Sequence, residues 1–179
     1  MSLVKFAARN HRQQVQRNGV DDSVDDRATT WELFDKIAAD WGPFTIDVAA
    51  AEHNTKCERY FDRQVDGLGQ PWDDERVWCN PPYSSIEPWV QKAWSGEADL
   101  VVMLLPANRT EQEWWQALVE PFRDRQGSPL RVVFLRGRHR FVRGGQRLVE
   151  ANERPPFGNC LLIWRYVSPE LPPRLGWDQ

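Results

Sequence analysis

The sequence predicts an α/β fold in which a mostly parallel central sheet is flanked by helices. Three observations support this prediction. The chain has 179 residues, 41% of them hydrophobic, which fits one globular domain. Short apolar runs alternate along it with segments in which apolar residues recur every three or four positions. Several of these segments begin at a capping residue, and strands that alternate with capped helices form largely parallel sheets.

The first predicted helix covers residues 31–41 and follows a polar arm. Residues 1–27 are rich in Arg, Gln and Asp and show no sustained hydrophobic period, so we expect a flexible or loosely docked N-terminal arm. Thr29 and Glu32 form a capping-box pattern, and Gly42 with the proline after it ends the helix.

Two strands are predicted to end in polar residues. The stretch FTIDVAA, residues 44–50, is apolar apart from Thr45 and Asp47, which is typical of a buried strand with a carboxylate near its carboxyl end. The stretch VWC, residues 77–79, runs directly into an Asn-Pro-Pro-Tyr turn. Only about 25 residues separate the two strands, and each parallel crossover takes a dozen or more. We therefore expect a reduced sheet.

The rest of the chain continues the alternation. The expected elements, in order, are a helix capped by Ser84 and Glu87, a strand over residues 99–107, a helix capped by Thr110 and Glu113, and strands over residues 131–135 and 159–166. A Pro-rich tail, residues 168–179, closes the chain, so the predicted domain covers residues 28–167.

Composition excludes several classes of protein. The longest apolar run, Leu100 to Leu105, is far shorter than the ~18 residues of a membrane span, and the N-terminus lacks the apolar core of a signal peptide. We therefore expect a soluble intracellular protein without a membrane partner. Three cysteines without metal-ligand spacing predict reduced thiols and no metal site.

Charge is distributed unevenly along the chain. A net charge of −3 argues weakly against nucleic-acid binding, because phosphate groups attract Lys and Arg. Between Arg131 and Arg147, however, six arginines occur without one acidic residue, and a local field of that kind matters more than the total. The run predicts phosphate contacts, and an ordinary solvated surface is the alternative. The candidate DNA-binding side chains are Arg136, Arg138, Arg140 and Arg143, with His139 as a further contact or an incidental neighbour.

The Asn-Pro-Pro-Tyr turn carries the most specific chemistry. Ligands of parallel sheets bind beyond the carboxyl ends of the strands, which places Asp47 and Asn80 on the same rim. Two prolines stiffen the turn, so the Asn80 side-chain oxygen and the Pro81 carbonyl can accept two hydrogen bonds from one NH₂ group on a planar ring, such as that of adenine. Tyr83 supplies a surface on which the ring stacks, worth ~1–3 kcal/mol. The alternative interpretation is a plain connection between a strand and a helix.

Seven blocks follow one another along the chain: TTWELF, FTIDVAA, DGLGQPW, VWCNPPYS, VVMLLPANRT, VVFLRGRHRF and PPFGNCLLIW. In this order, over residues 29–164, they resemble the phage-type DNA adenine-N6 methyltransferases, which use S-adenosylmethionine. The resemblance implies a reduced Rossmann-like methyltransferase fold and transfer of a methyl group to N6 of an adenine flipped out of double-stranded DNA. It also implies a cytoplasmic location in a bacterial host.

The resemblance assigns roles to individual residues. It implies that the target adenine is held by Asn80, Pro81, Pro82 and Tyr83. It implies that the cofactor is bound by Thr30, Asp47, Val48, Ala49, Asp66 and Leu68. It makes Phe141 the aromatic side chain that helps to hold the extruded base. The acid that binds the cofactor ribose stays open among Glu52, Glu58 and Asp62, each of which also suits an ordinary surface.

Two departures from the family pattern stand out. Many adenine methyltransferases have a glycine-rich turn after the first strand, whereas this chain has DVAAAEHN, and alanine does not enter positive φ freely. We therefore expect another path of the loop around the cofactor. The Thr-Pro pair of the family is Thr30 followed by Trp31 here, which loses a fixed φ but keeps a capping hydroxyl.

The predicted reaction is direct, in-line transfer from sulfonium to N6 without a metal ion, with the protein supplying mainly placement and polarisation. Turning a base out of the duplex costs a few kcal/mol, which backbone contacts of the arginine segment would offset. No stretch is long enough for a separate recognition domain, so short or relaxed sequence specificity is expected. The alternatives are methylation of RNA or of a protein glutamine amide, an inactive nucleic-acid-binding relative, and an α/β domain of unrelated function.

Overall fold

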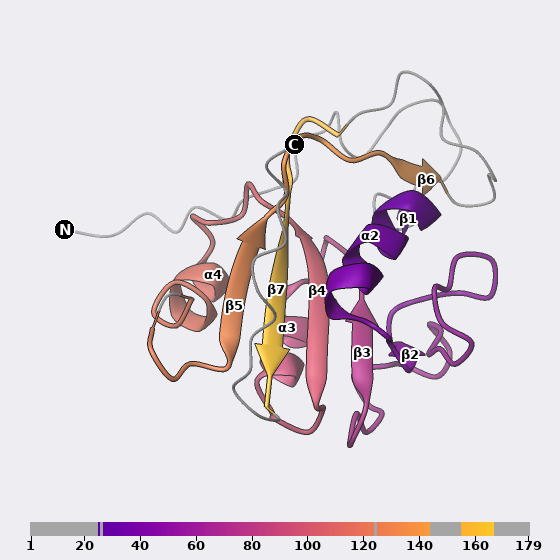
Figure 1. Ribbon diagram of the computed structural model, residues 1–179, viewed down its shortest axis with the longest axis horizontal. Coiled ribbons are helices and arrows are strands. Elements are labelled where there is room, and N and C mark those ends of the chain that lie inside the picture. Colours follow the sequence, from indigo (N-terminus) through magenta and orange to yellow (C-terminus); the bar gives the residue numbers. More distant parts are fainter. Residues whose placement is uncertain (1–24, 26, 124, 144–154, 167–179) are drawn as a thin grey trace.

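The computed structural model describes residues 25, 27–123, 125–143 and 155–166. Its elements are β1 (Arg27–Thr29), α2 (Trp31–Trp41), β2 (Ile46–Asp47), β3 (Arg76–Cys79), α3 (Glu87–Ala93), β4 (Leu100–Pro106), α4 (Glu113–Leu118), β5 (Leu130–Phe134), β6 (Phe141–Arg143) and β7 (Asn159–Arg165). They form a five-stranded sheet in the order β2-β3-β4-β7-β5 and a two-stranded sheet of β1 and β6 (Figure 1).

Four of the five strands of the large sheet run in the same direction. β2, β3 and β4 pair in parallel, whereas β7 is antiparallel to both β4 and β5. β5 consequently shares the direction of β4, and only β7 is reversed. The carboxyl ends of the four strands lie at the edge of the sheet drawn uppermost in Figure 1, near β6. The predicted α/β class with a mostly parallel sheet is confirmed.

Helices cover both faces of the sheet. β4 is buried along its whole length, and its residues point alternately into two hydrophobic clusters. Val101, Met103 and Leu105 pack with α3 and α4, while the residues between them pack with α2 on the other face. This double burial explains why the strand reads as an unbroken apolar run. Within the described part of the chain, no helix has the length and apolar character to cross a bilayer.

The edge strand β2 is much shorter than predicted. The sequence indicated a strand over residues 44–50, but only Ile46 and Asp47 are extended in the sheet. The strand ends there because the Asp47 carboxylate accepts a hydrogen bond from the Ala49 N–H at 3.4 Å and turns the chain. On its outer side, a short segment around Tyr60 forms a single parallel bridge to Asp47 in place of a full strand. The sheet is thus reduced, as predicted.

Three predicted helix caps were wrong in position. Thr29 belongs to β1, and the first helix is capped instead by Thr30, whose hydroxyl accepts from the Leu33 N–H at 3.3 Å. The N-caps of α3 and α4 are Ile86 and Gln112, and neither makes a side-chain capping bond. Ser84 instead donates two hydrogen bonds to the Asp25 carboxylate, a partner 59 positions away that local sequence patterns cannot reveal. At α4 the predicted cap Thr110 lies two residues before the actual N-cap, Gln112.

The described end of the predicted N-terminal arm is docked on the domain. The Asp25 carboxylate accepts hydrogen bonds from Ser84, and Arg27 is part of β1. Residues 1–24 and 26, and the predicted tail over residues 168–179, lie outside the described residues. The domain boundaries at residues 28 and 167 stay a prediction.

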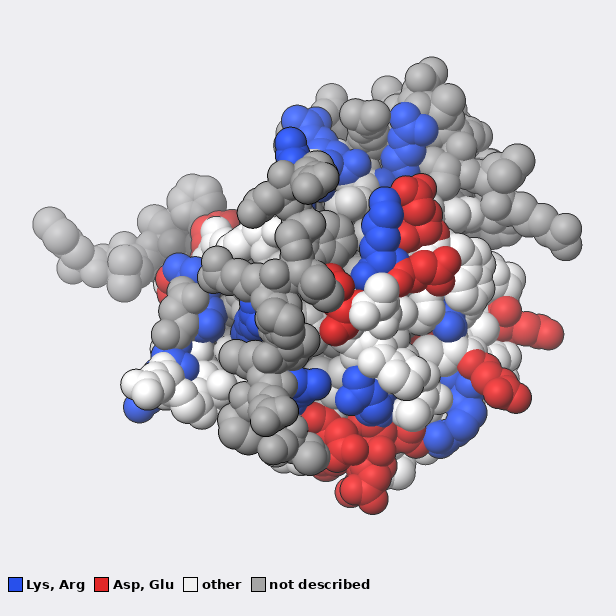
Figure 2. Space-filling model, viewed as in Figure 1, with Lys and Arg blue, Asp and Glu red and all other residues white. Residues whose placement is uncertain are grey.

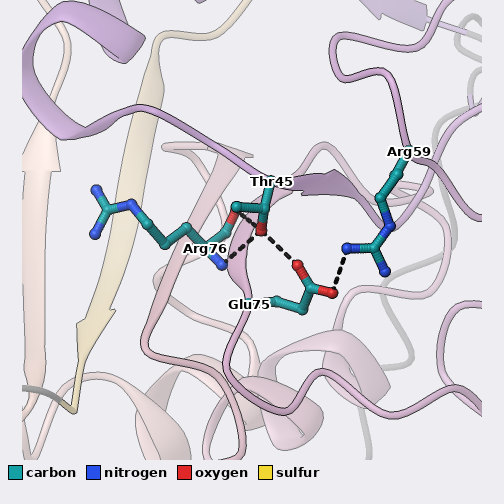
Figure 3. Close-up of polar contacts among 4 residues, drawn as sticks. All are labelled: Thr45, Arg59, Glu75 and Arg76. Carbon is teal, nitrogen blue, oxygen red and sulfur yellow. Dashed lines mark hydrogen bonds and ion pairs between the residues drawn. The ribbon is translucent and has the colours of Figure 1, made fainter.

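A polar network closes the amino end of the β2–β3 pair. Glu75 accepts a hydrogen bond from the Thr45 hydroxyl at 2.5 Å and forms an ion pair with Arg59 at 2.7 Å (Figure 3). Thr45 and Arg76 also exchange bonds, with N···O distances of 2.9 Å from Arg76 N to Thr45 Oγ1 and from Thr45 N to Arg76 O. We call Thr45, Arg59, Glu75 and Arg76 the amino-end clamp.

The Arg76 guanidinium points away from Glu75, toward the chain that leaves α2 (Figure 3). It donates to the carbonyls of Trp41 at 2.6 Å, Gly42 at 3.1 Å and Pro43 at 2.7 Å. These carbonyls lie at the carboxyl end of the helix, where backbone acceptors have no partner within the helix. The clamp therefore fixes the helix to the sheet at the end opposite the predicted site.

Candidate active site

The orientation of the Asn80 side chain is set by β1. Asn80 follows β3 directly, and its Nδ2 donates to the Arg27 carbonyl at 2.8 Å. A carbonyl only accepts hydrogen bonds, so the amide nitrogen must face Arg27 and Oδ1 must face elsewhere. Oδ1 is buried and has no hydrogen-bond partner in the described structure. A buried acceptor without a partner costs ~1–3 kcal/mol, so an arriving N–H donor would find an acceptor already desolvated and oriented.

The rest of the turn is built of rigid and aromatic residues. Pro81 is buried, and the Tyr83 ring packs against the hydrophobic cluster beneath the turn. Two phenylalanines contact this ring edge-to-face, Phe141 with centroids 6.3 Å apart and Phe157 with centroids 6.4 Å apart. These contacts fix the plane of the ring. Burial raises the pKa of the Tyr83 phenol well above its ordinary range, so the hydroxyl stays neutral.

Asp47 lies on the same rim as Asn80, as predicted. It pairs with Trp78, two residues before Asn80, and it is only 3% exposed. Its carboxylate accepts from the backbone N–H groups of Lys56 at 3.0 Å and Ala49 at 3.4 Å. Burial raises the pKa of Asp47 to about 6, although these two bonds and the charge of Lys56 lower it in part. A carboxyl with this pKa is mostly ionised at neutral pH and ready to attract a cation.

A buried lysine accompanies Asp47. Lys56 is 9% exposed, its Nζ donates to the Asn54 carbonyl at 2.7 Å, and burial lowers its pKa. The same Nζ lies 4.7 Å from the ring centroid of Trp31, which begins α2. This contact brings the start of α2, with its cap Thr30, beside the loop that follows Asp47. Sequence reasoning missed Lys56, because a lysine in a polar loop carries no signal of burial.

The loop over residues 66–68 packs directly against the residue after β2. A side chain at Gly67 would place its Cβ 2.1 Å from the Val48 carbonyl oxygen, so only glycine permits this approach. Asp66 has a positive φ of 56°, and its carboxylate accepts from the Leu68 N–H at 3.2 Å. The Trp72 indole donates to the Gly67 carbonyl at 3.0 Å and holds the loop in place. The structure therefore brings together the residues predicted from separate blocks to bind the cofactor.

Comparison with known proteins now identifies the family. Residues 16–172 match the family model described as DNA N-6-adenine-methyltransferase (Dam). The chain belongs to the Dam family. The match extends over more than half of the chain and confirms the resemblance inferred from the ordered sequence blocks.

Two phage proteins of the same description are similar to this Dam family member. The DNA N-6-adenine-methyltransferase of Escherichia phage T1 is 32% identical over 86 residues, which are 46% of this chain and 36% of that protein. The one of Haemophilus phage HP1 (strain HP1c1) is 35% identical over 82 residues, which are 44% of this chain and 47% of that protein. The matched part therefore spans less than half the length of either relative.

One solved structure is also similar in outline. It comes from Pyrococcus horikoshii, where it is provisionally assigned as an RNA methyltransferase. The similarity has a TM-score of 0.44 and 12% sequence identity, and it covers 74% of this chain and 78% of that chain.

The three acids considered for the ribose in this Dam family chain differ in burial. Glu52 and Glu58 are exposed, whereas Asp62 is partly buried. Asp62 comes directly after Phe61, whose N–H donates to the Asp47 carbonyl at 2.9 Å and whose carbonyl accepts from Ala50 at 3.1 Å. One Asp62 oxygen accepts from the backbone N–H groups of residues 64 and 65, both at 2.9 Å, which fixes the carboxylate.

The arginine segment of this Dam family chain lies beyond the carboxyl end of β5. Arg136 and Arg138 are exposed, Arg140 is partly buried, and Phe141 is 8% exposed beside Tyr83. The backbone of Arg143 lies in β6, opposite Arg27. Figure 2 shows Lys and Arg side chains at the upper end of the view, above the sheet edge that carries the site. The four arginines and Phe141 stay predicted DNA contacts.

Sequence reasoning missed other polar groups of this Dam family member. Besides Asn80 Oδ1 and Tyr83 Oη, five buried side-chain atoms have no hydrogen-bond partner in the described part of the chain: Thr29 Oγ1, Arg109 Nε, His139 Nε2, Asn159 Oδ1 and Trp164 Nε1. Asn159 begins β7 opposite Pro106, at the carboxyl end of β4. Burial lowers the pKa of His139, assisted by the charge of Lys36, so this side chain is neutral at physiological pH. All of these residues lie in the blocks that signalled the family, but only His139 was predicted as a contact.

Proposed function

We propose that this protein transfers a methyl group from S-adenosylmethionine to the exocyclic N6 of adenine in double-stranded DNA. A single observation carries the proposal: the buried Asn80 Oδ1 has no partner in the described structure and is turned away from Arg27 at the rim that also holds Asp47. Membership in the Dam family and the names of the two phage relatives support it.

The site activates an amine by placing hydrogen-bond acceptors. The two N6 hydrogens of the target adenine are donated to Asn80 Oδ1 and to the Pro81 carbonyl. With both hydrogens held, the nitrogen lone pair is drawn out of conjugation with the ring and directed at the electrophile. The cofactor would supply the methyl group: its S–CH₃ bond would break as the N–CH₃ bond forms, with the bonding electrons left on sulfur, and the extra proton on N6 would leave to water. The protein contributes placement and polarisation rather than a strong base.

Several residues fit the cofactor. S-adenosylmethionine, when bound, supplies a methyl group on a positively charged sulfur. Asp47 would present a mostly ionised carboxylate to that charge, as its pKa of about 6 permits at neutral pH. The backbone of Gly67 packs closely against Val48, next to Asp47. The residues proposed to hold the cofactor are Thr30, Asp47, Val48, Ala49, Asp66 and Leu68, with Asp62 for the ribose hydroxyls.

The adenine reaches this site only outside the duplex. Flipping costs a few kcal/mol, which stacking on Tyr83 and phosphate contacts of Arg136, Arg138 and Arg140 would offset. Phe141 supports the ring of Tyr83 and closes the side of the base. The short or relaxed sequence specificity stays a prediction, which mapping of methylated sites on a genome would test.

The decisive experiment measures labelled methyl incorporation into unmethylated DNA, followed by mass spectrometry of the nucleosides. We expect N6-methyladenine in DNA from the unmodified protein and none from Asn80→Ala. RNA and a glutamine-containing protein are offered in parallel, and incorporation confined to either of them would refute the DNA assignment. Calorimetry with S-adenosylmethionine is the second readout, since an inactive relative that lost the cofactor site gives no heat of binding.

A further inference from the structure

Asp25 and Arg27, near the N-terminus, form hydrogen bonds with the two ends of the Asn-Pro-Pro-Tyr turn. At one end the Arg27 carbonyl accepts from Asn80 Nδ2 at 2.8 Å. At the other end the Asp25 carboxylate accepts from the Ser84 N–H at 2.9 Å and from the Ser84 hydroxyl at 2.5 Å. These contacts join positions 53 and 59 residues apart in the chain. The turn is therefore held from outside as well as stiffened by its own prolines.

The same segment is tied to the aromatic wall of the site. β1 pairs with β6 so that Thr29 lies opposite Phe141, and Phe141 contacts the Tyr83 ring. Phe141 and Thr29 are 8% and 2% exposed, so this junction is buried. The position of β1 is thus fixed by a second sheet, and it places the Arg27 carbonyl firmly beside Asn80.

The chemistry of this contact distinguishes asparagine from aspartate. An amide offers a donor at one end and an acceptor at the other, and the Arg27 carbonyl selects the donor end. An ionised carboxylate has acceptors only, so one of its oxygens would face the Arg27 carbonyl across a distance at which two acceptors repel. A carboxylic acid would restore the bond only by keeping its proton.

We propose that Asp25 and β1 form a positioning strap that turns Asn80 Oδ1 toward the substrate amine and makes asparagine, rather than aspartate, the residue that this site requires. The proposal rests on the proposed function, because it is the substrate amine that Oδ1 serves. Asp25 and Arg27 act through Asn80 and do not touch the reacting atoms. They are positioning residues.

The first test needs no enzymatic activity. The Asn80→Asp variant is labelled with ¹³C at its aspartate carboxyls, and the new resonance is followed as the pH is raised. We expect the introduced carboxyl to titrate at least two pH units above the ordinary value of about 3.9, because the Arg27 carbonyl and burial both favour its neutral form. Titration within about one unit of the ordinary value would overturn the strap, whatever the protein methylates.

The second test follows methyl transfer. The ratio of kcat for Asn80→Asp to kcat for the unmodified protein should fall about tenfold for each pH unit above the pKa found by NMR, since only the protonated acid keeps the contact. A ratio that is independent of pH contradicts the proposal. Absence of adenine methylation by the unmodified protein refutes the proposed function instead, and the NMR titration still decides the strap.

The third test loosens the strap itself. Asp25→Ala removes both bonds to Ser84 and should lower kcat roughly tenfold without changing the Kd of S-adenosylmethionine. Ser84→Ala removes only the hydroxyl bond and should lower kcat less, and the double variant should be no worse than Asp25→Ala. Asp35→Ala, an exposed acid on α2, is the matched control and should retain full activity. Additive losses, or unchanged kcat in both single variants, would overturn the proposal even if Asn80→Asp failed to fold.

Discussion

The two ends of the β2–β3 pair differ in whether their polar groups have hydrogen-bond partners. At the amino end, every member of the clamp has a partner, and Arg76 alone satisfies three backbone carbonyls. At the carboxyl end, Asn80 Oδ1, Tyr83 Oη and Thr29 Oγ1 are buried without partners in the described structure. Polar groups with hydrogen-bond partners stabilise a fold, whereas buried polar groups without partners lower stability and are typical of functional sites. We call the carboxyl end of the β2–β3 pair, with its unpartnered groups, the open end.

The largest effect should come from the open end. Asn80→Ala removes the acceptor that polarises the substrate amine, and we expect methyl transfer to fall by more than about a thousandfold, comparable to loss of a key oxyanion donor. The Kd of S-adenosylmethionine should change little, because Asn80 is not among the residues proposed to hold it. Methyl incorporation and calorimetry measure the two quantities separately. Unchanged turnover would remove Asn80 from catalysis and end the contrast between the two ends.

Asp47, at the open end, should make the free energy of unfolding depend on pH. Burial raises its pKa from 3.8 to about 6, so the protonated form is favoured in the folded state. The stability that this proton contributes is fully present below pH 3.8 and is lost as the pH rises through about 6. At about 1.4 kcal/mol per pKa unit, the loss is of the order of 3 kcal/mol.

Urea unfolding between pH 4 and pH 7.5 checks this expectation. The Asp47→Asn variant should lose the downward slope of unfolding free energy in that window, because its amide does not titrate. A variant with the slope of the unmodified protein would show that Asp47 is not the responsible group.

The amino end should behave in the reverse manner. Arg76→Met leaves three carbonyls at the end of α2 without their donor, and we expect a loss of about 2 kcal/mol in unfolding free energy. Methyl transfer by the folded fraction at low temperature should be normal. Arg59→Met is the matched control: its ion pair with Glu75 is largely exposed on the arginine side, so its loss should cost no more than about 1 kcal/mol. If Arg76→Met lowered kcat as much as Asn80→Ala does, the two ends of the β2–β3 pair would be coupled.

The contrast also separates what the sequence could predict from what it could not. Leu100–Pro106 was predictable because burial on both faces requires an unbroken apolar run, and the Asn-Pro-Pro-Tyr turn because two prolines stiffen it locally. The predicted caps at Ser84 and Thr110 were wrong, and Ser84 takes a partner 59 residues away. The bond from Asn80 to Arg27 and the burial of Lys56 went unnoticed for the same reason, since both arise from contacts that no local period encodes.

The smallest effect concerns the basic side chains above the open end. Arg138→Ala and Arg140→Ala should each reduce DNA affinity only a few-fold at physiological salt, because each removes one phosphate contact among several. Each should also reduce by about one the slope of log K against log salt, and uniformly for different DNA sequences. Binding titrations at several salt concentrations measure this slope. Arg59→Ala, which removes an exposed arginine of the amino-end clamp, is the control and should leave both the affinity and the slope unchanged. An equal change in that variant would mean that DNA binds to positive charge anywhere on the surface rather than to the arginines near the proposed site.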